Sequence, residues 1–254
     1  MTHTELRIEL KRIAEAYGRD KNLRIDNSYR SAAIFHEIRD NFFPASFDAI
    51  ERNHLWRERL EKSHQKVPGA KEMQSANSSD ALLMTIFCHP KISSWKGVKD
   101  LLGVTSIDPH FGTKPGVKKK GTTGDGTEID MALDKVFVEA KLTESGFTEK
   151  PVTTVEAYTD LQNVFHTDLL HRNGDNFENY QVIRNLLAAI QLKKRHLLLC
   201  DERRPDLVRS YFETVVCLRK ETDRKSCGVI FWQELARVCG KGLRDYLAQR
   251  YGIL

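Results

Sequence analysis

Residues 127–142 read TEIDMALDKVFVEAKL, a stretch that predicts two β-strands joined by a short turn. Side chains alternate between the two faces of a strand, so the pairing that sets Ile129 opposite Ala140 makes one face of this hairpin apolar throughout. The same pairing sets Asp130 opposite Glu139 on the other face. The hairpin therefore predicts two carboxylates held close together beside a buried sheet.

Opposed carboxylates repel, and burying them without compensation is costly. Lys141 follows Glu139 on the same side of the same strand and supplies one positive charge. A divalent metal ion is the simplest further counter-charge. The register depends on the turn at Asp134 and Lys135, neither of which strongly favours a tight hairpin, and a slip of one residue would turn Asp130 away from Glu139.

The chain as a whole is typical of a soluble protein. It has 254 residues, of which 40% are hydrophobic and 30% charged. It has no apolar run near the roughly 20 residues that a membrane span needs and no secretory signal at its start, so we expect a cytoplasmic protein without membrane contact. The net charge of +5 mildly favours a polyanionic partner. Five scattered cysteines without a CxxC pair argue against a disulfide framework and a zinc ribbon.

Hydrophobic periodicity predicts an α/β chain with a helical N-terminal region over residues 1–70 and a second domain over residues 71–254. The spacing and the capping residues predict helices over residues 6–18, 29–41, 47–62, 79–87, 155–170, 180–193, 205–218 and one ending near residue 251. Strands are expected over residues 104–112, 197–200 and 229–232, besides the hairpin. The helix and strand after the hairpin predict a crossover and therefore a mixed sheet.

A glycine-rich loop, GTKPGVKKKGTTGDG, leads directly into the strand of Asp130 and carries Lys118, Lys119 and Lys120 in succession. Alone it is typical of a solvated surface loop. Its position next to the acidic residues also allows these lysines to hold a phosphate backbone. Both interpretations stay open on the sequence.

The order of helix, strands, helix and strand, with Asp130 followed by Glu139-Ala140-Lys141, resembles the PD-(D/E)XK nuclease superfamily. The segments VEAKLTESGF and YQVIRNLLAA resemble a little-characterised bacterial branch of it. The resemblance covers residues 78–202, and it departs from the family pattern in having Ile129 where a proline is usual. It implies a restriction-endonuclease-like core of helix, three strands, helix and strand, with a mixed sheet flanked by helices and an N-terminal helical extension.

The resemblance also implies roles for single residues. Asp130, Glu139 and the backbone carbonyl of Ala140 would hold Mg²⁺, which Mn²⁺ can replace, and Lys141 would orient or activate the attacking water. Gln181 matches a glutamine of several branches, although a polar residue at a helix start is an equal alternative.

Two further positions carry alternatives of the same kind. Arg184 could contact a phosphate or make a solvent ion pair. Asp80 would be a further ligand, or would stabilise the positive end of its helix.

The function implied is a Mg²⁺-dependent endonuclease that hydrolyses DNA, with a homodimer as one way to cut both strands. A non-cleaving nucleic-acid-binding module that keeps the nuclease fold is the alternative. A third interpretation makes the acidic hairpin a surface ion-pair ladder in a structural protein.

Overall fold

The predicted hairpin lies at the centre of a five-stranded sheet in the computed structural model, which describes residues 1–30, 32–121 and 124–254. Its strands are β4 (Ile129–Ala132) and β5 (Val136–Ala140). They pair antiparallel with Met131 opposite Val138 and Ala132 opposite Phe137, which confirms the predicted register at these pairs. β3 (His110–Thr113) pairs antiparallel with the other edge of β4 and begins later than the expected strand over residues 104–112.

The other half of the sheet is parallel. β5 pairs in parallel with β9 (Arg195–Cys200), and β9 with β10 (Cys227–Phe231), so the strand order is β10-β9-β5-β4-β3. The chain passes from β5 to β9 through α8 (Tyr180–Gln191), because parallel neighbours need a crossover. The fold is therefore α/β with a mixed sheet.

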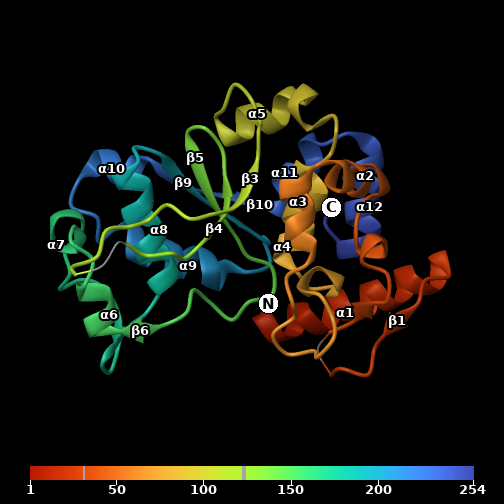
Figure 1. Ribbon diagram of the computed structural model, residues 1–254, viewed down its shortest axis with the longest axis horizontal. Helices are drawn as coiled ribbons and strands as arrows, with labels where there is room; N and C mark the ends of the chain where they lie inside the picture. Colours follow the sequence, from red (N-terminus) through yellow and green to blue (C-terminus); the bar gives the residue numbers. More distant parts are fainter. Residues whose placement is uncertain (31, 122–123) are drawn as a thin grey trace.

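Helices cover both faces of this sheet (Figure 1), with α8 and α9 (Pro205–Val215) on one side. The other side holds α4 (Ser79–Phe87), α11 (Trp232–Val238) and α12 (Lys241–Tyr251). The hairpin residues buried in the core on the α4 side are Met131, Leu133, Val136, Val138 and Ala140. Ile129 departs from the expected apolar face, since it packs with Phe137 in the core on the α8 side.

The N-terminal region packs directly onto the core of the sheet. α1 (His3–Lys21) starts with a capping box at Thr2, and its residues Leu6 and Leu10 lie in the same core as α4 and α12. The helix runs through Gly18, where we expected it to stop. A Cβ on Gly18 would lie 2.3 Å from Cδ1 of Ile25, so this glycine serves close packing.

Three expected helices differ from the structure. The expected helix over residues 29–41 is replaced by the hairpin of β1 (Ile25–Asp26) and β2 (Ile34–Phe35), followed by the 3-10 turn η1 (Ile38–Asn41). The expected helix over residues 47–62 is divided into α2 (Pro44–Arg52) and α3 (His54–Leu60), because the Asn53 side chain accepts hydrogen bonds from backbone N–H groups in the first turn of α3 and caps that helix. The helix expected over residues 155–170 is replaced by two short ones, α6 (Val152–Glu156) and α7 (Leu161–Val164).

The remaining elements are short. They are η2 (Glu72–Gln74), η3 (Ile92–Ser94), α5 (Lys96–Leu102), α10 (Glu221–Lys225) and a small sheet of β6 (Lys150–Pro151), β8 (Asn176–Phe177) and β7 (Arg172–Asn173). Of the helices described, none combines the length and the apolar character that crossing a membrane requires.

Candidate active site

Glu139 and Lys141 lie at the end of β5, on the face that α8 covers. Both are buried, with 1% and 5% of their surface exposed. The Lys141 ammonium nitrogen lies 2.9 Å from Oε1 of Glu139 and donates a hydrogen bond of 3.0 Å to Oε1 of Gln181. The lysine is thus held between a carboxylate on its own strand and an amide on the helix.

The polar residues of α8 support this ion pair. Nδ2 of Asn185 donates to Oε2 of Glu139 over 2.6 Å, and Nε of Arg184 donates to Oδ1 of Asn185 over 2.9 Å. Residues four apart lie on one face of a helix, which is why Gln181 and Asn185 reach Lys141 and Glu139 together. The polar side of α8 therefore lies against the end of β5.

Arg184 has a different environment from the one expected for a phosphate contact. It is 2% exposed, and its Nη2 donates to the backbone carbonyl of Glu128 over 2.8 Å as well as to Asn185. A guanidinium enclosed in this way ties α8 to the segment before β4. A side chain this deeply buried is not placed to make the expected contact with a phosphate of nucleic acid.

Asp130 lies where the ladder between β4 and β5 opens. In a continued ladder Ile129 and Ala140 would form a hydrogen-bonded pair, two residues beyond Met131 and Val138. The backbone N–H of Ala140 donates to Oδ2 of Asp130 over 2.8 Å. The N–H and C=O of one strand residue point to the same edge, so the carbonyl of Ala140 also faces this opening.

The protonation of these groups is set by their burial and by one another. Burial, with the charges of Glu139 and Asp80, raises the pKa of Asp130 well above its ordinary value. Burial also acts to raise the pKa of Glu139, but the neighbouring charge of Lys141 outweighs it and lowers that pKa. For Lys141 burial acts to lower the pKa, and the carboxylates, Glu139 foremost, raise it instead. At neutral pH the pair of Glu139 and Lys141 is therefore ionised.

The oxygen atoms at this opening suit a hard cation. Oε1 of Glu139 is buried and accepts no hydrogen bond of good geometry from the described residues, so its ion pair with Lys141 leaves a lone pair without a partner. The described residues contain no group of three or more His, Cys, Asp or Glu side chains arranged to hold a metal ion. Mg²⁺ commonly takes one or two carboxylates together with water and substrate phosphates, and Asp130 and Glu139 match that smaller set.

Asp80, the expected further ligand, lies on the first turn of α4 and is engaged by two cations. Nη2 of Arg59 donates to its Oδ2 over 3.2 Å and Nζ of Lys62 over 3.4 Å. Its charge contributes to the raised pKa of Asp130, so the two carboxylates are electrostatic neighbours. Its place in the first turn of α4 also suits the alternative role at the positive end of the helix, while the side chain of Ser78 caps the helix by accepting from the N–H of Ala81 over 3.1 Å.

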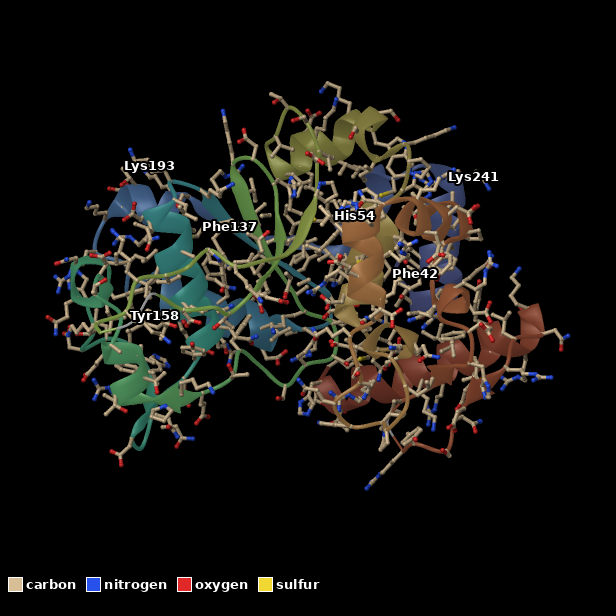
Figure 2. The ribbon with its side chains drawn as sticks, in the orientation of Figure 1. Phe42, His54, Phe137, Tyr158, Lys193 and Lys241 are labelled. Carbon is tan, nitrogen blue, oxygen red and sulfur yellow. The ribbon has the colours of Figure 1, made fainter. Side chains whose placement is uncertain are left out.

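The glycine-rich loop that carries Lys118, Lys119 and Lys120, called the lysine loop below, is attached to the connection between α6 and α7. Nζ of Lys119 lies 3.0 Å from Oδ2 of Asp125 and 4.8 Å from the ring centroid of Tyr158. Asp125 is buried and also accepts a hydrogen bond from the hydroxyl of Tyr180 over 3.1 Å. Tyr158 lies on the side of the molecule opposite to His54 and Phe42 (Figure 2).

The three lysines therefore differ in their surroundings. Lys119 is engaged within the fold, whereas Lys118 and Lys120 are exposed. Thr122 and Thr123 of this loop lie outside the described residues.

Two residues at the site had no role in the sequence prediction. Asn185 lies four residues after Gln181 and therefore on the same face of the helix, and this spacing was the available signal. Arg59 reaches the site from α3, and nothing in its local sequence indicates this contact, because it depends on how α3 packs against β3.

One protein-family model matches the chain over residues 12–252, that of the family described as "Restriction Endonuclease associating with ARP". No curated protein and no solved structure matches the chain.

Proposed function

The chain belongs to the restriction endonuclease family described as associating with ARP, and from this membership we propose that it is a metal-dependent endonuclease that hydrolyses DNA phosphodiester bonds. The family match covers nearly the whole chain and by its description implies a nuclease with DNA as substrate. The finer assignment, to the PD-(D/E)XK nucleases with Mg²⁺ as cofactor and Mn²⁺ as a substitute, is part of the proposal.

One observation carries this assignment most directly, the buried ion pair of Glu139 and Lys141 beside the opening that Asp130 lines. A buried ion pair is a poor way to stabilise a fold, since apolar residues of the same size would often serve as well. A buried ion pair next to a carboxylate of raised pKa is typical of a functional site. The third interpretation, an exposed ion-pair ladder, does not fit side chains this deeply buried.

Asp130, Glu139 and the carbonyl of Ala140 are the groups that would hold the cation. A bound divalent cation stabilises the negative charge that builds up on the oxygens of the reacting phosphate. The carboxyl of Asp130 has to lose its proton for this, and its raised pKa makes that loss more costly than for an exposed aspartate.

Lys141 acts as a cation in this proposal. Its raised pKa keeps the ammonium group protonated at neutral pH, so it donates hydrogen bonds to the phosphate or the attacking water and does not remove a proton. Gln181 accepts a hydrogen bond from one of the three N–H groups of Lys141 and so fixes the direction of the other two. Gln181 is therefore a positioning residue for Lys141.

The exposed Lys118 and Lys120 are proposed to contact the phosphate backbone outside the reacting centre. Cutting both strands of a duplex takes two active centres, and we propose a homodimer as the assembly that supplies them.

Cleavage assays on Glu139→Gln and Lys141→Gln test the proposal. Each substitution removes one charge of the site, and we expect each to abolish cleavage of duplex DNA in Mg²⁺ or Mn²⁺. The matched controls are Asp134→Asn and Lys135→Gln, which remove the same charges from the exposed turn of the same hairpin and should cleave as the wild type does. Full cleavage by both site variants would refute the assignment. A wild-type protein that binds DNA but neither cleaves it nor binds Mn²⁺ would favour the non-cleaving module.

A further inference from the structure

Arg59 brings a positive charge from the N-terminal region into the candidate site. Its Nη1 donates to Oε2 of Glu128 over 2.7 Å and its Nη2 to Oδ2 of Asp80 over 3.2 Å. Asp80, Glu128 and Asp130 together raise its pKa against the opposing effect of burial. Nε of Arg59 is buried and has no hydrogen-bond partner among the described residues. The guanidinium is thus held between the carboxylates of Asp80 and Glu128, and the charge of Asp80 in turn acts on Asp130.

The fold fixes this position from several sides. Nε1 of Trp56, on the same helix as Arg59, donates a hydrogen bond of 3.2 Å to the carbonyl of Pro109. The Trp56 ring packs edge-on against Phe111 of β3, with 6.2 Å between the ring centroids. Gly112 in β3 has a φ of +63°, and a Cβ there would lie 2.4 Å from Nη1 of Arg59. The strand edge therefore leaves space for the guanidinium.

Lys62 adds a second positive charge. Its Nζ lies 3.4 Å from Oδ2 of Asp80 and 2.9 Å from Oε2 of Glu72. Its side chain is 43% exposed, whereas that of Arg59 is 15% exposed. Both cations come from the segment around the end of α3, so one part of the N-terminal region compensates the acidic site.

We propose that Arg59, assisted by Lys62, is the built-in counter-ion of the acidic site and opposes the binding of a divalent cation at Asp130 and Glu139. The inference rests on the proposed function, because it concerns the metal of that same site. A cation that approaches Asp130 is attracted by the carboxylates and repelled by the guanidinium beside them. The N-terminal region thereby sets the metal affinity, and any movement of α3 away from β3 would raise it.

Calorimetric titration of the full chain with Mn²⁺, without DNA, tests this inference. Arg59→Gln keeps hydrogen-bonding groups for Asp80 and Glu128 but removes the charge, and we expect its Kd for Mn²⁺ to be about three- to tenfold lower than that of the wild type. Lys62→Gln should lower the Kd by a smaller factor, and Arg59→Lys, which keeps the charge, should stay close to the wild type. The control is Arg57→Gln, which removes an exposed charge from the same helix.

The outcomes separate this inference from the proposed function. If Mn²⁺ binding by the wild type depends on Glu139 but Arg59→Gln and Lys62→Gln bind Mn²⁺ no more tightly, the counter-ion role is refuted and the metal site stands. If Glu139→Gln binds Mn²⁺ as the wild type does, or no protein in the series binds it, the metal site is refuted and the counter-ion role with it. If Arg59→Gln lacks a cooperative melting transition, the exposed Lys62 decides the question through Lys62→Gln.

Discussion

Asn185 on α8 donates a hydrogen bond of 2.6 Å to Oε2 of Glu139 on β5, and this bond joins the crossover helix to the candidate active site. Asn185 is itself fully buried, and its Oδ1 accepts from both Nε and Nη2 of Arg184. Glu139 is therefore oriented by two side chains in series, Asn185 and then Arg184. If Glu139 holds the proposed cation, Asn185 and Arg184 are the outer partners that orient it, and loss of such partners typically lowers metal affinity or activity by about 10- to 100-fold.

The first prediction is that Asn185→Ala lowers both Mn²⁺ affinity and DNA cleavage by about 10- to 100-fold. The substitution removes the donor to Glu139 and leaves the Arg184 guanidinium short of an acceptor. Calorimetry with Mn²⁺ and a cleavage assay measure the two effects, and Asn163→Ala in the exposed part of α7 is the control. A variant that loses stability but binds Mn²⁺ as tightly as the wild type would limit Asn185 to a structural role.

The parts of the site that lie on one strand pair could be predicted from the sequence. The alternation of side chains in a strand determines which residues share a face, and this was sufficient for Glu139, Lys141 and the register at Met131 and Val138. It was insufficient for Ile129, because the pairing of β4 and β5 ends before that residue and its side chain packs on the other side of the sheet.

Contacts between distant segments had no such rule. Arg59 and Asp80 are 21 residues apart and meet only because α3 packs on β3 and α4 packs on the sheet. The helices expected over residues 29–41 and 155–170 were wrong for a related reason. Apolar residues at helical spacing there are buried by tertiary packing of short strands and turns, which overrides a weak local preference.

The second prediction concerns the lysine loop. Lys118→Gln and Lys120→Gln should each weaken DNA binding across all sequences and reduce the slope of log affinity against log salt by about 1, as expected for the loss of one phosphate contact. Binding titrations at several salt concentrations measure this. The control is Lys241→Gln, because this lysine is 81% exposed and lies in α12 on the opposite side of the molecule (Figure 2).

Lys119→Gln should behave differently from its neighbours. Its ammonium group is engaged by Asp125 and Tyr158, so the substitution should lower the free energy of unfolding and leave the salt slope nearly unchanged. Equal slopes for the wild type, Lys118→Gln and Lys120→Gln would show that the loop does not contact the backbone of DNA.

The third prediction is that Asp130→Asn stabilises the metal-free protein at neutral pH, by about 1–2 kcal/mol. The pKa of Asp130 is higher in the folded protein than its unfolded value of about 3.9, so the folded state binds the extra proton between these two values. The free energy of unfolding of the wild type therefore falls as the pH rises from the unfolded to the folded pKa of Asp130. Above the folded pKa the whole destabilisation by the buried charge is present. Asparagine removes the charge and keeps an oxygen that can accept from the N–H of Ala140.

Urea unfolding in EDTA at pH 7.5 measures the effect of Asp130→Asn, with Asp134→Asn in the exposed turn as the control. Addition of Mg²⁺ should stabilise the wild type and leave Asp130→Asn unchanged, because the variant lacks one of the two carboxylates. A metal-free variant less stable than the wild type would mean that the charge of Asp130 contributes favourably to folding.

The last prediction concerns His196 on β9, which is 1% exposed and stacks on Tyr211 with its Nδ1 3.0 Å from the tyrosine hydroxyl. Burial lowers its pKa to about 4, against a weaker opposing effect of Glu139. The pKa of histidine in the unfolded chain is about 6.5, so between these two pKa values the unfolded state binds more protons. The free energy of unfolding therefore falls as the pH falls, by about 3 kcal/mol over the whole window.

His196→Phe keeps the aromatic packing and cannot titrate, and the tyrosine hydroxyl retains its hydrogen bond to the backbone carbonyl of residue 196. Urea unfolding of both proteins from pH 7.5 to 4.5 should give a difference in free energy that grows in favour of the variant as the pH falls, since the groups common to both cancel. His54→Gln on the exposed start of α3 should track the wild type, and a difference independent of pH would show that His196 is not kept neutral by the fold.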